Sequence, residues 1–223
     1  MEKQVSGVIK AVIFDMDGLL LDTEKLLVKF WQEAAREAGF PMTREIALNI
    51  RSMHRSFAIP YLKSELGENF DYLKIRARRM ELMSAHLEKY GLELKKGAKE
   101  LLTYLNESKI PAAVATATDY ERAEKYLKET GIFGYFDKII CATMVKVGKP
   151  KPDIYIYAAS ELGLEPSECA ALEDSPNGVK SAAAAGCKTI MVPDLTEPDE
   201  ELSRIIAAKA GSLNEVIDII CKL

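Results

Sequence analysis

Short runs of apolar residues, most of them β-branched, alternate along this chain with segments in which apolar residues recur every three or four positions. Polar residues or proline close each run. Short, closed runs of this kind are typical of strands that are buried on both faces of a sheet. We therefore predict strands at 8–14, 111–115, 138–142, 169–172 and 189–192.

The segments between the later runs have the period of amphipathic helices. They predict helices over 96–108, 119–131 and 152–163. Strands that alternate with helices form parallel sheets with right-handed crossovers. The predicted fold class is therefore α/β, with a Rossmann-like, doubly wound parallel sheet as its core.

The stretch from about Glu24 to Tyr90 differs, because it has helical periodicity and no convincing strand. Its first predicted helix carries an apolar stripe of Leu26, Leu27, Phe30, Trp31, Ala34, Ala35 and Ala38. A second long helix, over 72–91, is expected to turn inward the apolar residues Leu73, Ala77, Met80 and Leu87. We predict an α-helical cap over 23–91, inserted into a core made of 1–22 and 92–223, with a ligand cleft at the border.

Composition argues against several classes of protein. The 223 residues are 48% hydrophobic and 29% charged, as in ordinary globular proteins. The formal net charge is -4, and Lys and Arg do not form a separate basic segment of the sequence. Both observations argue against a nucleic-acid partner. No stretch approaches the roughly 20 apolar residues of a membrane span, and the N-terminus does not resemble a signal peptide. We expect a cytoplasmic monomer with a small substrate and no membrane partner.

Histidine and cysteine offer little for other common sites. The two histidines, His54 and His86, are far apart, which leaves little material for a histidine-based zinc site or a Ser-His-Asp triad. The four cysteines are scattered without a CxxC spacing, and we interpret them as reduced core residues. They are Cys141, Cys169, Cys187 and Cys221.

Polar side chains follow four of the predicted strands. They are Asp15 and Asp17, Thr116 and Thr118, Lys149, and Glu173 and Asp174. Because the carboxyl ends of parallel strands meet at one edge of a sheet, we expect these side chains to share one rim. Carboxylates held close together repel one another and stay ionised when a cation joins them, and a hard ion such as Mg²⁺ is suited to that role. A hydroxyl and an ammonium suit a phosphate, so the rim predicts phosphoryl transfer, with one carboxylate as nucleophile and another as proton donor.

Four segments in this order resemble the motifs of the haloacid dehalogenase-like hydrolases. They are "DMDGLLLD", Thr116 after its strand, Lys149 in "GKPKPD", and "EDSPNGV". The resemblance spans 8 to about 192, and the helical insertion lies where the β-phosphoglucomutase-like branch has its cap. Within that branch the chain looks most similar to pseudouridine monophosphatase-like and sugar-phosphatase-like members.

This resemblance implies a role for each matched residue. Asp15 would be the nucleophile that forms an aspartyl-phosphate, and Asp17 the general acid and then the general base. Thr116 and Lys149 would contact the phosphate. Mg²⁺ would be held by Asp15, the carbonyl of Asp17 and Asp174, with Glu173 close by or coordinating. The implied substrate contacts are Gly18, Ala117, Thr118, Arg55 and Arg78, or Arg79 in place of Arg78.

Two departures favour a phosphatase over a mutase. The mutases of this branch carry a histidine where this chain has Leu27, and a leucine cannot pass protons. They tend to carry a lysine where this chain has Asp119. Two other functions stay open, a hexose-phosphate mutase and a phosphometabolite-binding regulator without turnover. The motif residues also have ordinary structural interpretations, of which one is that Glu173 and Asp174 cap a helix begun at Pro176.

Overall fold

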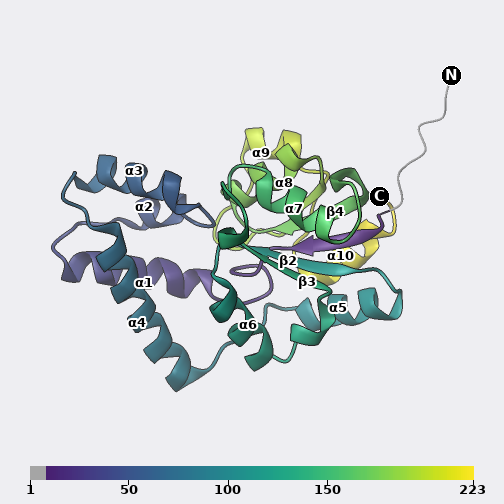
Figure 1. Ribbon diagram of the computed structural model, residues 1–223, viewed down its shortest axis with the longest axis horizontal. Helices are drawn as coiled ribbons and strands as arrows, with labels where there is room; N and C mark the ends of the chain where they lie inside the picture. Colours follow the sequence, from purple (N-terminus) through teal and green to yellow (C-terminus); the bar gives the residue numbers. More distant parts are fainter. Residues whose placement is uncertain (1–8) are drawn as a thin grey trace.

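A six-stranded parallel sheet forms the centre of the computed structural model, which describes residues 9–223 (Figure 1). The strands are β1 (Ala11–Phe14), β2 (Ala112–Thr116), β3 (Lys138–Cys141), β4 (Cys169–Glu173), β5 (Lys188–Met191) and β6 (Ala208–Lys209). Their order is β3-β2-β1-β4-β5-β6, and every neighbouring pair is parallel. The chain winds outward from β1 in one direction and then in the other, so the switch point of the sheet lies beside β1.

Helices cover both faces of this sheet (Figure 1). They are α5 (Ala98–Glu107), α6 (Tyr120–Glu129), α7 (Asp153–Glu161), α8 (Pro176–Ala185), α9 (Glu200–Ile205) and α10 (Leu213–Ile220), with short 3-10 turns η1 (Phe133–Tyr135), η2 (Ala142–Met144) and η3 (Pro166–Glu168). Val12 and Phe14 pack with α5, α6 and α10, whereas Ala11 and Ile13 pack with α7 and α8. Alternate residues of β1 thus serve opposite layers, as the twofold period of a strand requires.

Four further helices lie between β1 and α5 and extend away from the sheet (Figure 1). They are α1 (Glu24–Glu37), α2 (Arg44–Asn49), α3 (Arg55–Leu66) and α4 (Tyr72–Tyr90). They share a hydrophobic cluster of their own, to which Trp31, Ile46, Leu62, Phe70 and Ile75 belong. The residues that bury this cluster come almost entirely from the insertion, so it has a core separate from the two layers of the sheet.

The predicted α/β class and parallel sheet are confirmed. The five predicted strands are present, although the first begins at Ala11 and Val8 lies outside the described residues. The structure adds β6, α9 and α10, for which no prediction was made. The division into a core of 1–22 and 92–223 and a cap of 23–91 stays a prediction, and residues 1–8 of it fall outside the described part.

The inward face of α4 was predicted wrongly at two of its four positions, whereas Met80 and Leu87 are half-buried. Leu73 is 64% exposed and Ala77 is also exposed, whereas Ile75, Arg79 and Met83 are buried. The cause is that an arginine belongs to the inward stripe, so counting apolar positions selected a neighbouring face. In α1 the expected stripe is buried at its centre, from Phe30 to Ala35, and Ala38 is exposed.

The cysteine interpretation is confirmed in its main part. All four cysteines are free, and Cys141, Cys169 and Cys187 are buried, while Cys221 is exposed. Of the helices in residues 9–223, none combines the length and the apolar character that crossing a bilayer requires.

Candidate active site

The predicted motif residues meet at the carboxyl edge of the sheet. Phe14 is in register with Val114 of β2 and with Leu172 of β4, so the residues that follow these positions lie side by side. The backbone N–H of Asp15 donates to the carbonyl of Leu172 at 3.0 Å. The predicted catalytic and metal residues are all buried: Asp15, Asp17, Thr116, Lys149, Glu173 and Asp174.

Lys149 connects the nucleophile position to the fourth motif. Its Nζ donates to Asp15 Oδ1 at 2.5 Å, to Glu173 Oε1 at 2.6 Å and to the carbonyl of Ala115 at 2.9 Å. These bonds occupy all three donors of the ammonium group. Burial alone would lower the pKa of Lys149, but the adjacent carboxylates of Asp15 and Glu173 raise it above its ordinary value. The lysine therefore remains charged.

Three carboxylates form a cluster that fits a metal ion. Asp15, Glu173 and Asp174 each offer one oxygen, and these oxygens lie within 4.8 Å of one another. Asp15 Oδ2 and Asp174 Oδ1 are buried and accept no hydrogen bond from any described residue. Burial raises the pKa of Asp15 to about 8 and that of Asp174 well above its usual range. A group of buried carboxylates that accepts so few hydrogen bonds suits a hard cation, and Mg²⁺ is such an ion.

Asp17 stands apart from this cluster and is held by two threonines. Thr23 Oγ1 donates to Asp17 Oδ1 at 2.7 Å, and Thr118 Oγ1 donates to Asp17 Oδ2 at 2.8 Å. Both oxygens are thus fixed by neutral donors from the insertion and from the loop after β2. This orientation leaves the carboxyl beside the cavity, where proton transfer to a substrate is possible.

Gly18 allows the first motif to turn beneath the carboxylates. Its φ is +88°, and a Cβ there would lie 2.5 Å from both Asp174 Oδ2 and Glu24 Cγ. Neither the conformation nor the space admits a side chain. Gly18 therefore sets the close approach of Asp174 to the first motif.

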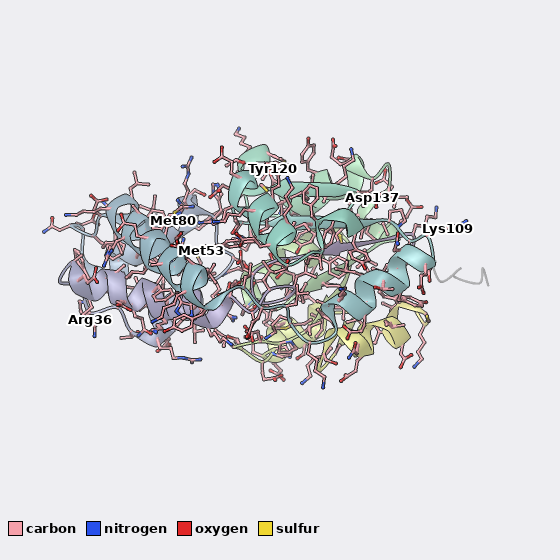
Figure 2. All side chains as sticks on the ribbon, turned by 90° about the horizontal axis from the view of Figure 1, so that it is seen from below. Arg36, Met53, Met80, Lys109, Tyr120 and Asp137 are labelled. Carbon is pink, nitrogen blue, oxygen red and sulfur yellow. The ribbon has the colours of Figure 1, made fainter. Side chains whose placement is uncertain are left out.

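A cavity of about 110 Å³ lies over these residues, between the insertion and the sheet edge. Asp15, Asp17, Thr116, Ala117 and Thr118 line its floor. Half of the lining residues that the insertion contributes are aromatic, arginine or methionine residues: Trp31, Arg51, Met53, Tyr72, Arg76, Arg79 and Met83. Figure 2 places Met53 where the insertion meets the sheet, and Arg36 at the far end of the insertion.

Comparison with known proteins agrees with the motifs and the sheet. The family model described as haloacid dehalogenase-like hydrolase matches residues 9–186. The chain belongs to the haloacid dehalogenase-like hydrolases. The Phosphorylated carbohydrates phosphatase of Thermotoga maritima is 32% identical, over 81% of this chain and 83% of the relative. The Beta-phosphoglucomutase of Bacillus subtilis is 29% identical, over 79% of this chain and 80% of the relative.

A solved structure agrees with this assignment. The crystal structure of CbbY from Rhodobacter sphaeroides in complex with phosphate has a TM-score of 0.78 and 26% identity, and covers 94% of this chain and 96% of that one. The predicted family, its β-phosphoglucomutase-like branch and the prediction of an enzyme are confirmed.

The arginines of this hydrolase divide between the cavity and the surface. Arg79 is buried, and its Nε has no hydrogen-bond partner among residues 9–223. The guanidinium carbon Cζ lies 5.3 Å from the ring centre of Trp31. Burial lowers the pKa of Arg79 to about 10. Arg78 instead pairs with Glu37 at 2.6 Å and is not among the residues that line the cavity. Of the two predicted positions, the structure therefore brings Arg79 to the site and leaves Arg78 outside it.

Arg55 lies beside the cavity rather than in it. It lines a neighbouring hollow of about 420 Å³, which shares Arg76 and Ala117 with the cavity. Arg76 lies 3.7 Å from Asp119, which also caps α6 by accepting from the N–H of Arg122. The hollow next to the predicted phosphate site is thus lined in part by the basic side chains of Arg55 and Arg76.

Arg51 is a site residue whose orientation the sequence left open. Its Nη1 lies 3.2 Å from Asp174 Oδ2 and its Nη2 donates to Thr196 Oγ1 at 2.5 Å, and both members of the ion pair are buried. No periodicity or motif indicates this contact, because Arg51 lies on a loop more than a hundred positions before Asp174. Arg51 thus joins the insertion to the acidic cluster.

Two other site residues also escaped sequence reasoning. Glu24 is buried at the cavity, and burial raises its pKa well above the usual range. Tyr155 of α7 received no prediction from the sequence, and its hydroxyl donates to Glu173 Oε1 at 2.5 Å. The helix begun at Pro176 is capped by Ser175, which accepts from the N–H of Gly178, so Glu173 and Asp174 are not its cap.

Proposed function

We propose that this protein is a Mg²⁺-dependent phosphatase that hydrolyses a small phosphorylated metabolite, either a sugar phosphate or a nucleotide-like monophosphate. The observation that carries the proposal is the state of Asp15. One of its oxygens is held by Lys149, and the other is buried at the floor of a cavity with no hydrogen-bond partner in residues 9–223. A carboxylate oxygen held in this way is suited to attack a phosphorus atom.

In the proposed mechanism Asp15 Oδ2 attacks the phosphorus, and the bond to the leaving oxygen breaks while Asp17 donates a proton to that oxygen. The product is an aspartyl-phosphate on Asp15. A water then attacks the phosphorus, Asp17 takes its proton, and free phosphate leaves. The hydrogen bonds from Thr23 and Thr118 support this role, because they orient both oxygens of Asp17.

The phosphate would be held by side chains already at the rim. Thr116 would contact its oxygens, and Lys149 would do so by exchanging one of its three present acceptors. The backbone of Gly18 and Ala117 and the side chain of Thr118 would lie nearby. Asp15 and Asp174, with the carbonyl of Asp17, would hold Mg²⁺, and Glu173 stands beside them. Bound there, the ion would neutralise charge on the phosphoryl group.

Helices α1–α4 would act as the cap that excludes water and contacts the leaving group. Of the two arginines predicted for this contact, Arg79 would make it, because it lines the cavity and Arg78 does not. Arg55 would contact a substrate that extends into the neighbouring hollow.

Leu27 supports hydrolysis over mutase action. It lines the cavity, so an apolar side chain occupies the position at which the mutases of this branch carry a histidine. The similarity to a phosphorylated-carbohydrate phosphatase of Thermotoga maritima supports the same choice. The similarity to a β-phosphoglucomutase keeps the mutase as the second candidate.

A phosphate-release screen tests the proposal. Purified protein with Mg²⁺ is offered about a hundred phosphorylated metabolites, including β-hexose 1-phosphates, and both free phosphate and isomerised product are measured. We expect free phosphate, loss of release with EDTA and recovery on adding Mg²⁺. Isomer without net phosphate release would favour the mutase, and substrate binding without release would favour the regulator. Size-exclusion chromatography tests the monomer, and fractionation of the native cell tests the cytoplasmic location.

A further inference from the structure

A buried phenol stands behind the proposed nucleophile. Tyr155 has no exposed surface and is not among the residues that line the cavity. Its hydroxyl donates to Glu173 Oε1 at 2.5 Å, and the same oxygen accepts from Lys149 Nζ at 2.6 Å. Lys149 in turn donates to Asp15 Oδ1 at 2.5 Å. A continuous chain of hydrogen bonds therefore runs from α7 to the nucleophile.

The two oxygens of Glu173 are held unequally. Oε1 accepts from two donors at short distances, whereas among the described residues Oε2 has only the hydroxyl of Ser175, at 3.4 Å. Lys149 is fixed from two sides, since its Nζ also lies 5.1 Å from the ring centre of Tyr155. The phenol thus restrains both members of the Lys149–Glu173 pair.

Packing does not explain the hydroxyl. Tyr155 belongs to the apolar layer formed with β1, β2 and β4, where its neighbours include Ile13, Ala113 and Ile154. A phenylalanine would fill the same space. A buried hydroxyl is costly without a partner, and the partner here is Glu173.

We propose that Tyr155 is a positioning residue for phosphoryl transfer: its hydroxyl fixes Glu173, Glu173 fixes Lys149, and Lys149 turns Asp15 so that Oδ2 stays free to attack. This inference rests on the proposed phosphatase function. Glu173 is then chiefly an anchor for Lys149.

Comparing Tyr155→Phe with Tyr157→Phe tests the role. Tyr157 lies on the same helix and is 37% exposed, so its variant removes a hydroxyl without touching Glu173. We expect kcat of Tyr155→Phe to fall about tenfold with KM within about twofold, because misplacing a reacting group slows the chemical step more than it weakens binding. The Tyr157→Phe variant should match the wild type. A Tyr155→Phe variant whose kcat equals that of Tyr157→Phe overturns the proposal.

A double-mutant cycle with Glu173→Gln separates positioning from general loss of structure. If Tyr155 acts through Glu173, adding Tyr155→Phe to Glu173→Gln should change kcat by less than about twofold. Full additivity of the two effects contradicts the inferred chain.

Calorimetric titration of Mg²⁺ gives a measurement that needs no substrate. Loss of the phenol donor leaves more negative charge on Glu173, so Mg²⁺ should bind Tyr155→Phe about threefold more tightly, with no such change in Tyr157→Phe or in the Glu173→Gln background. A wild type that hydrolyses no phosphomonoester would defeat the proposed function alone. The titration would then test whether Tyr155 acts on Glu173. An unchanged Mg²⁺ affinity in Tyr155→Phe would overturn that role.

Discussion

Two aspartates of the acidic cluster share one arrangement. Asp15 has Lys149 at one oxygen and Asp174 has Arg51 at one oxygen, while the other oxygen of each has no partner in the described part of the chain. Each carboxylate is thus half neutralised by a basic side chain. The remaining charge is concentrated on two buried oxygens, which makes the cluster sensitive to protons as well as to cations.

The stability of the metal-free protein should fall as the pH rises from about 6 to about 8. Burial raises the pKa of Asp15 from 3.8 to about 8, so between these values the folded protein keeps a proton that the unfolded chain releases. Mg²⁺ replaces such protons, and the rise in Tm that it causes should be larger at the higher pH. Thermal melts at both pH values, with and without Mg²⁺, measure this.

The Asp15→Asn variant is the control for this pH dependence. It removes the titrating group, so the fall in Tm with pH should be shallower. A slope equal to that of the wild type would assign the effect to other residues.

Asp15→Asn should also lower kcat by at least about a thousandfold, because an amide is not a nucleophile toward phosphorus. The side chain keeps its shape, and its carbonyl oxygen can still accept from Lys149. We expect the circular dichroism spectrum to be unchanged. Activity near that of the wild type would remove Asp15 from its proposed role.

The sequence revealed the residues whose position follows from a strand end. Asp15, Thr116 and Glu173 could be placed because each is at or just beyond the carboxyl end of a buried strand. Arg51 and Tyr155 could not, because an isolated arginine on a loop and a tyrosine in an apolar helix have no local signal of their partners. Their roles depend on contacts that only the folded chain creates.

At the scale of elements, α4 directs neighbouring arginines to different surroundings. Arg79 is buried at the cavity, whereas Arg78 forms exposed ion pairs with Glu37 and Glu81. One helical position of about 100° separates the two side chains. Substituting Arg79 therefore tests the cavity, and substituting Arg78 on the same helix is the matched surface control.

Arg79→Ala should lower kcat/KM for the best substrate about tenfold or more, because it removes a buried cation from the cavity. Arg78→Ala should leave kcat/KM unchanged and cost at most about 1 kcal/mol of stability, as an exposed pair does. Steady-state kinetics on both variants measure the difference. Equal losses of activity would contradict the assignment of Arg79.

The elements that sequence reasoning found are those with a strong local pattern. The five longer strands are mainly apolar and end in buried residues, whereas β6 has only two residues and depends on pairing with β5. The orientation of α4 failed for another reason. Its inward face was chosen by apolar periodicity, but a face that lines a polar cavity carries Arg76 and Arg79 among its inward residues.

At the scale of the molecule, residues 49–54 of the insertion are hydrogen-bonded to the start of α8 and to Lys149, at the carboxyl edge of the sheet. Asn177 Nδ2 donates to the carbonyls of Asn49 and Arg51 at 3.0 and 2.9 Å. The N–H of His54 donates to the carbonyl of Lys149 at 2.8 Å. Together with the Arg51–Asp174 ion pair, these bonds join this segment of the insertion to the acidic cluster.

Arg51→Met should lower the free energy of unfolding by about 3 kcal/mol without Mg²⁺, because it leaves Asp174 buried without its cation. Added Mg²⁺ should restore most of this loss. Urea titrations followed by the fluorescence of Trp31, the single tryptophan, measure both effects. Arg55→Met is the control, since Arg55 is exposed, and should change stability by no more than about 0.5 kcal/mol. Equal effects of the two substitutions would argue against the ion pair as the connection.

The close contact between Gly148 and His54 limits which helical insertions could replace α1–α4 on this sheet. A Cβ at position 148 would lie 3.1 Å from His54, so even an alanine there would push against the loop that carries Arg51. A chimaera that grafts another protein's helices onto this sheet inherits that steric limit. The foreign segment that replaces residues 51–54 must pass Gly148 along the same path as in this protein. Otherwise the foreign helices will be displaced relative to Lys149, however well they pack among themselves.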